Sequence, residues 1–593
     1  GFTSKNTNAV LTVSGQAQAY TTLQSAGTLK TTDTASSNQT DFATHKPTLN
    51  IGTTSSKGNL DNEGTLYAHN LDSSGPKFDT LNNGVINLAT NNTITFKGNV
   101  TNNGAFNIDG ASGILNIQGG DLTNKGMING SYSHSQSGPF SNYVPNNGPT
   151  PLTFKVENGS IDNVGSMRAV AELKTYSAPS QSSFTKGADY SITNSGTIIS
   201  GNSNSSITLL ANNDHSKGNV SAPTNNSTGS VIDNGVLQFG NSASYASKGV
   251  LTVKAYNNVT LNGQVEQVAP GNKTPSAVSK NNPLSSARLW ADYSNGKPTG
   301  NGTLTLSTPL TTTRYDTLYG QKVKVMSNLS RVTSASDSTQ SGTINIISGD
   351  KPKSGYSVRV AKGKTVSAGL VEIKGQAPSG GTYANPNVIL QGKLSGNIQL
   401  GGNGAGSVPS SGTYPNETIP YGAVSDVFTG PKGGINAVNS GTSNPHVVMN
   451  FTGRVKNAPY TNDKSNFRYN YLPITSKNSI HLTLNPVAYK TNGTTGVSSS
   501  GSPSAVNILA NSNVTLSGMD KPSSVPAAGH SSVSGIYNWP NTHLVLQSTG
   551  NITTRGASQA NFYWPGLVYL GTINTVNGQP APGTLSDFGT ISA

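Results

Sequence analysis

One short phrase recurs at near-constant spacing, and this repeat constrains the fold more than any other feature of the sequence. A clear copy, Val100-Thr101-Asn102-Asn103-Gly104-Ala105-Phe106, has an aliphatic residue, an Asn two places before a Gly and an apolar residue two places after that Gly. Four copies place their glycines 20, 20 and 22 residues apart, at Gly64, Gly84, Gly104 and Gly126. Such a fixed period indicates a solenoid.

The phrase continues with wider gaps at Ile161–Gly165, Ile192–Ile198 and Ile232–Leu237. After Gly126, the glycines of the phrase are Gly165, Gly196 and Gly235, which lie at successive intervals of 39, 31 and 39 residues. These gaps fit either one coil with an inserted loop or two coils of which only one carries the phrase. The register beyond residue 235 is left open.

Short β-forming runs lie between the phrases, and no segment has a long helical period. Examples are Thr93–Phe96, Ile114–Ile117, Ile207–Leu210 and Val250–Val253. A coil of about 20 residues built from two or three such strands and tight corners is one rung of a parallel β-helix. Stacked rungs share a core of Leu, Ile, Val and Phe that one rung cannot bury alone. The predicted fold class is all-β, a right-handed parallel β-helix (solenoid) with loop insertions.

The recurring Asn is expected at a corner of each rung. Asn and Gly tolerate the left-handed backbone that corners often require, and Asn side chains on successive rungs can hydrogen-bond in a ladder. The alternative, that Asn-x-Gly merely reflects a chain with 68 glycines, is disfavoured because the flanking apolar residues recur with it. The predicted structural corner ladder comprises Asn62, Asn82, Asn102, Asn124, Asn163, Asn194 and Asp233.

The composition suits a thin core with a polar surface. Of 593 residues, 33% are hydrophobic and 11% are charged, whereas a disordered chain would favour charge and lack repeated β-branched runs. The net charge is +13, but the 38 basic residues show no tight cluster along the sequence. We therefore expect weak attraction to anionic surfaces such as lipopolysaccharide or sialylated glycans, and no nucleic-acid partner.

The chain contains no cysteine, which excludes disulfides and thiolate metal sites and is typical of proteins that cross an outer membrane unfolded. No apolar run approaches the roughly 18 residues that span a bilayer. Because no signal peptide is recognisable at Gly1-Phe2-Thr3, we expect a mature product or an excised fragment.

Turn-rich intervals divide the sequence into five expected parts. Gly- and Pro-containing stretches mark the boundaries between strand groups. The parts are an N-terminal cap or first rungs (1–48), a β-helix with Asn-x-Gly corners (49–265), a loop or small inserted subdomain (266–300), further β-helix with insertions (301–490) and C-terminal rungs with an aromatic cluster (491–593).

The phrases Val100–Gly104 and Ile192–Ile198, with Ile508–Gly518 near the C-terminus, resemble the secreted β-helical passengers of Gram-negative bacteria. Two groups are similar: autotransporter passengers, including the vacuolating-cytotoxin-like group, and filamentous-haemagglutinin-like exoproteins. The resemblance implies an export route and a translocator in the outer membrane, not a ligand. The sequence departs from these groups in two ways. Haemagglutinin-like proteins have Asn-Pro-Asn turns in an N-terminal secretion domain, whereas Asn385-Pro386-Asn387 is internal here. Autotransporters end in a β-barrel, whereas no series of alternating barrel strands is recognisable in this sequence.

Catalytic chemistry has little support in the sequence. Glycoside cleavage needs two carboxylates about 5–9.5 Å apart, and the candidates Asp61, Asp162 and Asp233 lie in the corner phrase, where a structural role is favoured. The histidines are interpreted as scattered loop residues, and no Gly-x-Ser-x-Gly elbow has credible partners. We therefore predict a non-enzymatic protein with no catalytic residues, no cofactor site and no metal site.

Aromatic residues gather near the C-terminus, beside prolines. Exposed, they would stack on sugars or form an interface; buried, they would cap the β-helix. This candidate interaction surface comprises Tyr537, Trp539, Phe562, Tyr563 and Trp564.

The leading functional hypothesis is a secreted or cell-surface bacterial protein whose β-helix displays loops for adhesion or host interaction. Its expected partners are a host receptor, glycan or other cell surface, and an outer-membrane translocator during export. The alternative is a structural subunit of an extracellular filament, sheath or surface layer that associates end to end. A polysaccharide-acting enzyme or tailspike ranks last, because carboxylates are sparse.

Overall fold

A computed structural model describes the strands of the chain and the corners that join many of them. The described residues form strands, turns and bends without any helix, so no membrane-spanning helix occurs among them. They are 2–4, 10–14, 17–19, 22–25, 28–32, 48–51, 59–63, 65–68, 70–72, 79–89, 93–109, 113–130, 132–133, 144–145, 152–176, 189–200, 206–212, 228–240, 249–268, 278–279, 282–294, 297–298, 302–333, 339–349, 356–376, 386–401, 421–422, 427–429, 433–439, 443–451, 455–457, 471–486, 505–518, 543–555, 561–563, 567–576, 579–582, 585–587 and 590–592.

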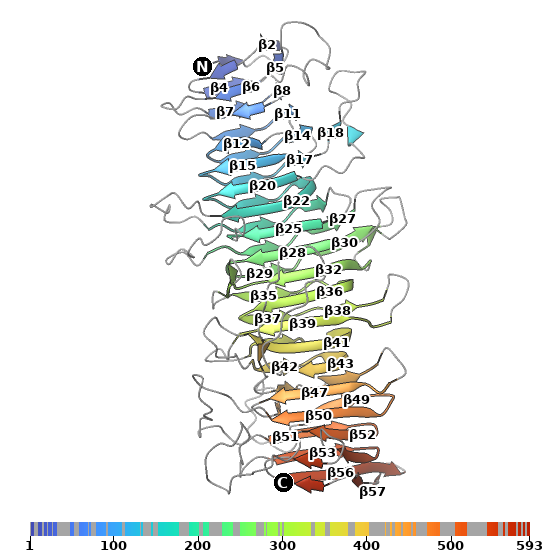
Figure 1. Cartoon of the computed structure of the whole chain (residues 1–593). Helices are drawn as coiled ribbons and strands as arrows, with labels where there is room; N and C mark the ends of the chain where they lie inside the picture. The colour runs from blue at the N-terminus through green and yellow to red at the C-terminus, as the bar shows by residue number, and fades with distance from the viewer. Residues whose placement is uncertain are drawn as a thin grey trace, which may run out of the picture. The chain divides into compact units, whose positions relative to one another are not determined.

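The chain divides into two compact units. The first holds residues 1–295 and 307–309, and the second holds residues 296–306 and 310–593. In each unit the strands of consecutive coils pair in parallel, as Figure 1 shows. The predicted all-β class and parallel stacking are confirmed, and the arrangement is consistent with a β-helix.

Each coil of the first unit contributes strands to three columns. The first column is β1 (Phe2–Ser4), β4 (Thr22–Ser25), β7 (Asn59–Asn62), β10 (Thr80–Asn82), β13 (Val100–Asn102), β16 (Leu122–Asn124), β21 (Ile161–Asn163), β23 (Ile192–Asn194), β26 (Val231–Asp233) and β29 (Val259–Leu261). The second is β2 (Val10–Ser14), β5 (Thr28–Thr32), β8 (Thr65–Ala68), β11 (Val85–Ala89), β14 (Ala105–Asp109), β17 (Met127–Asn129), β22 (Ser166–Tyr176), β24 (Thr197–Ser200), β27 (Val236–Phe239) and β30 (Gln264–Val268). The third is β3 (Ala17–Ala19), β6 (Thr48–Ile51), β9 (Asn70–Asp72), β12 (Thr93–Lys97), β15 (Ile114–Gln118), β20 (Leu152–Glu157), β22 again, β25 (Ser206–Ala211), β28 (Val250–Ala255) and β32 (Leu284–Trp290).

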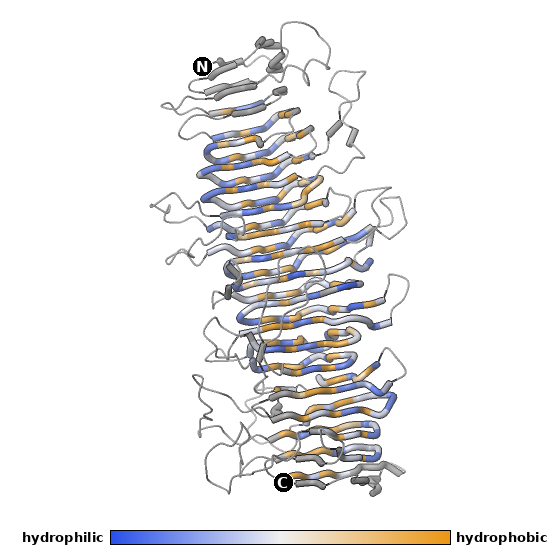
Figure 2. Tube along the Cα trace, in the orientation of Figure 1, coloured by the Kyte–Doolittle hydropathy of each residue, from blue (hydrophilic) through white to orange (hydrophobic). Residues whose placement is uncertain are grey.

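The columns align like residues in the core. Strand side chains alternate between the two faces, so the inward positions of successive rungs stack directly on one another. Figure 2 shows the resulting alternation of hydrophobic and hydrophilic residues along the strands. One buried column in the second sheet is Leu66, Ile86, Phe106, Ile128, Met167, Ile198 and Leu237, and one in the third is Ile94, Leu115, Phe154, Leu173, Leu209, Val253 and Leu289.

The strand pairing fixes what the sequence left open about the wide gaps. Asn124 pairs with Asn163, Asn163 with Asn194, and Asn194 with Asp233, so each interval of 39, 31 or 39 residues holds one coil. The register of the rung that follows residue 235 is given by the pairing of Leu261 with Asp233.

The pairing bears on two of the expected parts. The interval 266–300, expected to be a loop or small inserted subdomain, contains β32, which pairs in parallel with β28 and has buried leucines at both Leu284 and Leu289. Its Pro283 precedes the strand instead of interrupting it. The region 1–48, left as cap or first rungs, contributes strands that continue the three columns.

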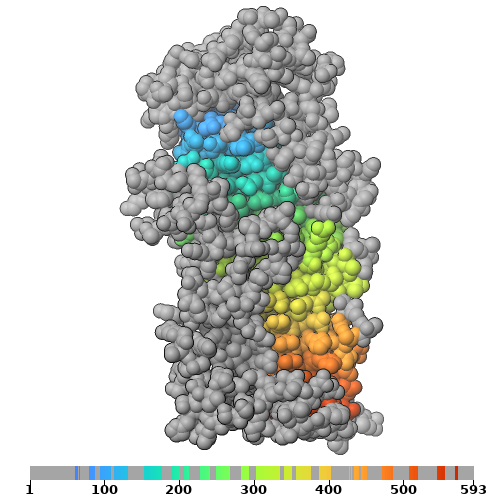
Figure 3. Space-filling model, in the orientation of Figure 1, coloured from blue at the N-terminus to red at the C-terminus, as the bar shows by residue number. Residues whose placement is uncertain are grey.

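The second unit repeats the three-column pattern. Its first column is β35 (Thr303–Leu306), β37 (Lys322–Val325), β40 (Val358–Val360), β42 (Val388–Leu390), β45 (Val427–Thr429) and β48 (Val455–Asn457). The second is β36 (Leu310–Gly320), β38 (Leu329–Arg331), β41 (Thr365–Gln376), β43 (Lys393–Leu400), β46 (Gly434–Ala437), β49 (Leu472–Thr475), β51 (Ala505–Ala510), β53 (His543–Ser548) and β56 (Leu567–Val576). The third is β36, β39 (Thr343–Ser348), β41, β43, β47 (His446–Phe451), β50 (Ile480–Pro486), β52 (Val514–Gly518), β54 (Ile552–Arg555) and β58 (Leu585–Asp587). On the face drawn in Figure 3, the described side chains of this unit follow one another in chain order.

The corner between the first and second strands is held by backbone hydrogen bonds from rung to rung. The carbonyl of Asn82 accepts hydrogen bonds from the N–H groups of both Asn103 and Gly104, at 2.8 and 3.0 Å. The same fork joins Asn102 to the N–H groups of Lys125 and Gly126. Both corner N–H groups of each of these rungs therefore donate to the preceding rung.

The reason predicted for the corner glycines was wrong. Among the described residues, neither the corner asparagines nor glycines such as Gly104 and Gly126 have a positive φ. A Cβ added to Gly126 would instead lie 2.0 Å from the carbonyl oxygen of Gly104 in the preceding rung. Glycine is required at this position because successive corners stack too closely there for a side chain.

Left-handed backbone occurs at a different corner, between the third strand and the next rung. Positive φ angles recur there on successive rungs, at Gly98, Gly119, Asn158, Tyr190 and Gly229. Two of these positions, Asn158 and Tyr190, carry side chains, and a Cβ on Gly119 would have no heavy atom within 4 Å. The left-handed geometry predicted for one corner therefore belongs to the other.

Gly126→Ala is expected to destabilise the first unit by about 3 kcal/mol, because the new Cβ must displace the backbone of the preceding rung. Thermal and denaturant unfolding of the full chain measure this change. Gly119→Asn is the matched control: no heavy atom lies within 4 Å of a Cβ there, and Asn tolerates its φ of +74°. Equal stability of the two variants would contradict the close-stacking account.

Candidate functional site

The seven predicted corner residues lie in one buried column of the first unit. Each Asn donates a hydrogen bond from Nδ2 to the side-chain oxygen of the next member, at 2.7–2.8 Å. The first five Nδ2 groups also donate to a backbone carbonyl of the next rung, at 3.0–3.4 Å. All seven side chains are at most 1% exposed. An amide suits this position because it supplies a donor and an acceptor at once.

Asp233 ends the ladder. Its Oδ1 accepts a hydrogen bond from Asn194, whereas its Oδ2 has no hydrogen-bond partner among the residues that the structure describes. The next rung places the apolar Leu261 at the corner, so no side-chain donor follows. Burial raises the pKa of Asp233 to about 6, although the hydrogen bonds from Asn194 and from the Gly235 backbone act in the opposite direction.

A second polar column, missed from the sequence, joins the rungs at the other end of the first strand. Side-chain oxygens accept hydrogen bonds from the backbone N–H of the next rung, at 2.7–3.3 Å. Each acceptor lies three residues before a ladder residue and is always Asp, Asn or Ser, a signal that the sequence does contain. The acceptors are Asp79, Asn99, Asp121, Ser160, Ser191 and Ser230.

The three carboxylates considered for catalysis do not meet. Asp61 and Asp162 are half-buried and precede the corner residue, so only Asp233 occupies the corner itself. Leu81, Thr101 and Thr123 separate Asp61 from Asp162 along their column. The predicted corner placement was therefore wrong for two of the three.

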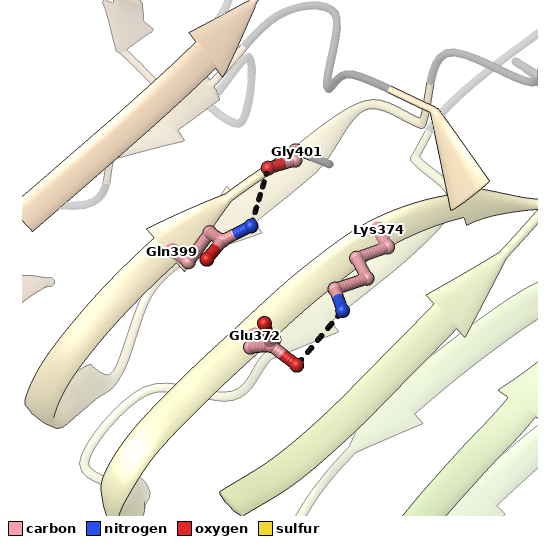
Figure 4. A network of polar contacts seen from close by, with 4 residues as sticks. All are labelled: Glu372, Lys374, Gln399 and Gly401. Carbon is pink, nitrogen blue, oxygen red and sulfur yellow. Dashed lines mark hydrogen bonds and ion pairs between the residues drawn. The ribbon is translucent and has the colours of Figure 1, made fainter. Parts of the chain in front are cut away.

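A small group of polar side chains lies on β41 and on the adjacent strand of the second unit (Figure 4). The Nζ of Lys374 lies 2.8 Å from Oε2 of Glu372, and both side chains are mostly buried. On the adjacent strand, Gln399 donates a hydrogen bond to the carbonyl of Gly401 at 3.3 Å. Glu372 and Gln399 occupy paired positions on the two strands. The carboxylate of Glu372 is thus engaged in a structural ion pair with Lys374.

Two histidines come together that the sequence left apart. His446 and His481 occupy paired positions on β47 and β50, with ring centroids 4.9 Å apart. The ring of His481 also contacts the amide of Asn444. The expectation that His446 lies in a loop was wrong, because it opens a strand. The described part of the chain nevertheless contains no group of three or more potential metal-binding His, Cys, Asp or Glu side chains.

The aromatic candidate surface falls mostly outside the described residues. Tyr537, Trp539 and Trp564 are not among them. Phe562 and Tyr563 lie in β55 (Asn561–Tyr563), which pairs in parallel with β59 (Thr590–Ser592). Its role as an interaction surface stays a prediction.

Comparisons with known proteins do not identify a family. No family model, no curated protein and no solved structure matches this chain. The functional argument therefore rests on the chain's own residues and their arrangement.

Asn102→Ala is expected to reduce the stability of the adjoining rungs by about 2–3 kcal/mol, because Asn82 loses its acceptor and Asn124 its donor in a buried site. Hydrogen exchange of residues 80–126, followed by mass spectrometry, measures the local free energy of opening. Asn103→Ala, which removes the exposed bond to Asn83, is the control and should change it by less than about 1 kcal/mol. Similar losses in both variants would contradict a special role for the buried ladder.

Asp233→Asn is expected to stabilise the first unit at neutral pH but not in acid. With a folded-state pKa of about 6 against an ordinary 3.8, the stability that Asp233 contributes is complete below about pH 3.8 and is lost as the pH rises through 6. The variant does not undergo this loss, so its advantage should grow to about 3 kcal/mol at pH 7. Unfolding midpoints of both proteins from pH 4 to pH 8 measure the difference, and a constant offset would contradict the assignment.

Proposed function

We propose that this chain is a non-enzymatic, secreted or cell-surface bacterial protein whose right-handed β-helix displays loops and side chains for adhesion or host interaction. The supporting observation is a register that is maintained while coil length varies. Ladder neighbours are 20 residues apart at Asn62 and Asn82, and 39 apart at Asn124 and Asn163, yet their hydrogen bonds are alike. The scaffold thus accommodates inserted segments without losing its stacking, as a display protein requires.

The right-handed winding is part of the proposal. Connections between parallel strands of the same sheet are right-handed in about 98% of cases, because of the twist of the strands. The coils of this chain are such connections, repeated from rung to rung. We extend the general rule to this chain on that basis.

Stepwise folding outside the cell would suit this architecture. Each rung that stacks buries its apolar column, at roughly 25 cal/mol per Å². A chain without cysteine can cross a membrane unfolded without forming premature disulfides. Export through an outer-membrane translocator therefore belongs to the proposal.

The location is tested by adding proteinase K to intact cells of the source bacterium and probing with an antibody against residues 80–130. We expect the antigen to be shed into the medium or cleaved on intact cells, while a cytoplasmic marker stays whole. Protection of the antigen until the cells are lysed would contradict the proposal. Beads coated with the purified chain should then attach to host epithelial cells more than beads coated with albumin.

A further inference from the structure

Six cations from three successive coils of the second unit lie on the first strands and at the corner that follows them. β37 supplies two of them, β40 and the turn after it supply three, and the first residue of β43 supplies one. We call this set the basic corner: Lys322, Lys324, Arg359, Lys362, Lys364 and Lys393.

Backbone contacts place these residues on neighbouring rungs. Lys324 pairs directly with Arg359 on the adjacent strand, and strands in a sheet are about 4.8 Å apart. The N–H of Lys393 donates to the carbonyl of Lys364 at 2.9 Å. Lys362 lies in the turn between, and both Lys362 and Lys393 are exposed. The cations therefore form one patch that crosses about two rung spacings.

The five lysines of the basic corner carry most of its unbalanced charge. Among the described residues, no carboxylate forms an ion pair with any of the five lysines. Of the described acidic side chains in this part of the unit, Asp316 is buried, and Glu372 is paired with Lys374. Folding thus brings together cations from coils that the sequence separates.

Arg359 is held in a fixed orientation. Its Nε and Nη2 donate to Oε1 of Gln391 on the next rung, at 3.0 and 2.7 Å. Its guanidinium carbon lies 5.6 Å from the centre of the Tyr356 ring. An oriented cation loses less side-chain freedom on binding than a freely moving one, so it is a better anion receptor.

We propose that the basic corner binds a linear acidic polysaccharide, a chain that carries carboxylate or sulfate groups at regular intervals. Like charges held together repel one another, and an extended polyanion relieves that repulsion at several points at once. The patch runs across stacked rungs, so its charges repeat along a line and match a linear ligand. The inference names a ligand for the surface display and in that sense rests on the proposed function.

Two other polyanions fit less well. Single-stranded nucleic acid is usually held by aromatic stacking platforms as well as cations, and the ring of Tyr356, three residues before Arg359, already lies against that guanidinium. Anionic membranes are bound most stably when apolar side chains enter the lipid, and the exposed residues that the structure describes at this corner are Lys362, Gly363 and Lys393. Both classes are outcomes of the test.

The test compares two triple variants of the full chain that remove the same charge. The corner variant is Lys362→Glu, Lys364→Glu and Lys393→Glu. The control variant changes three dispersed exposed cations, Lys125→Glu, Arg168→Glu and Lys477→Glu. Circular dichroism and thermal unfolding establish first that both are folded.

Binding is measured by biolayer interferometry on immobilised heparin and on immobilised alginate, which supply sulfate and carboxylate, at several salt concentrations. We expect the wild type and the control variant to bind one or both, and the corner variant to lose about tenfold or more in affinity and to show a shallower salt dependence. Equal losses in both variants would overturn the proposal in favour of diffuse charge. Tighter binding to duplex DNA or to phosphatidylglycerol vesicles than to either polysaccharide would overturn the ligand class.

Attachment of coated beads to host cells separates this inference from the proposed function. If the corner variant loses polysaccharide binding but beads carrying it attach as the wild type does, the patch is upheld and its role in adhesion fails. If no form of the chain binds either polysaccharide while attachment persists, the patch inference fails and the display function stands.

Discussion

The fold depends on the superposition of one tight corner on the next. At this corner the backbone of each rung lies so near its neighbour that a Cβ on Gly104 or Gly126 would fall about 2 Å from a carbonyl oxygen. The same approach lets one Asn carbonyl accept two N–H groups of the next rung. With the corner fixed in this way, the strands on either side can only continue in parallel and in register.

That register has consequences inside and outside the protein. Inside, it stacks residues such as Ile86, Phe106 and Ile128 into continuous apolar columns and lines up the buried amides. Outside, it turns residues that are distant in the sequence into neighbours. Lys324 and Arg359 form part of one charged surface in this way, and the rings of His446 and His481 lie next to each other. A scaffold that groups surface side chains by rung suits the display of a repeated binding surface.

Much of the fold could be predicted because the corner demands particular side chains. An amide that both donates and accepts can repeat from rung to rung, so the ladder from Asn62 to Asn194 is visible as a periodic Asn before a Gly. The cause of the glycine requirement could not be predicted, since close stacking and a left-handed backbone leave the same residue in the sequence. Only the structure assigns positive φ to the other corner, at Gly98 and Asn158.

The surface features were harder to predict than the core. The acceptor column that includes Asp79 and Ser160 has a sequence signal, three residues before each ladder residue, but the variety of Asp, Asn and Ser conceals it. The basic corner has only a partial local signal, Arg359, Lys362 and Lys364, because Lys322, Lys324 and Lys393 come from the neighbouring coils. Its members become neighbours only once the strand pairing is known.

Hydrogen exchange of the unmodified full chain, resolved to single corners by fragmentation mass spectrometry, tests the central claim most directly. The account predicts that the amides of Asn83, Gly84, Asn103, Gly104, Lys125 and Gly126 exchange as slowly as those of the adjoining strands, because each donates to a carbonyl of the preceding rung. Exchange of these corner amides at the rate of an open turn, with protection confined to the strands, would contradict the stacked corner on which the fold is built.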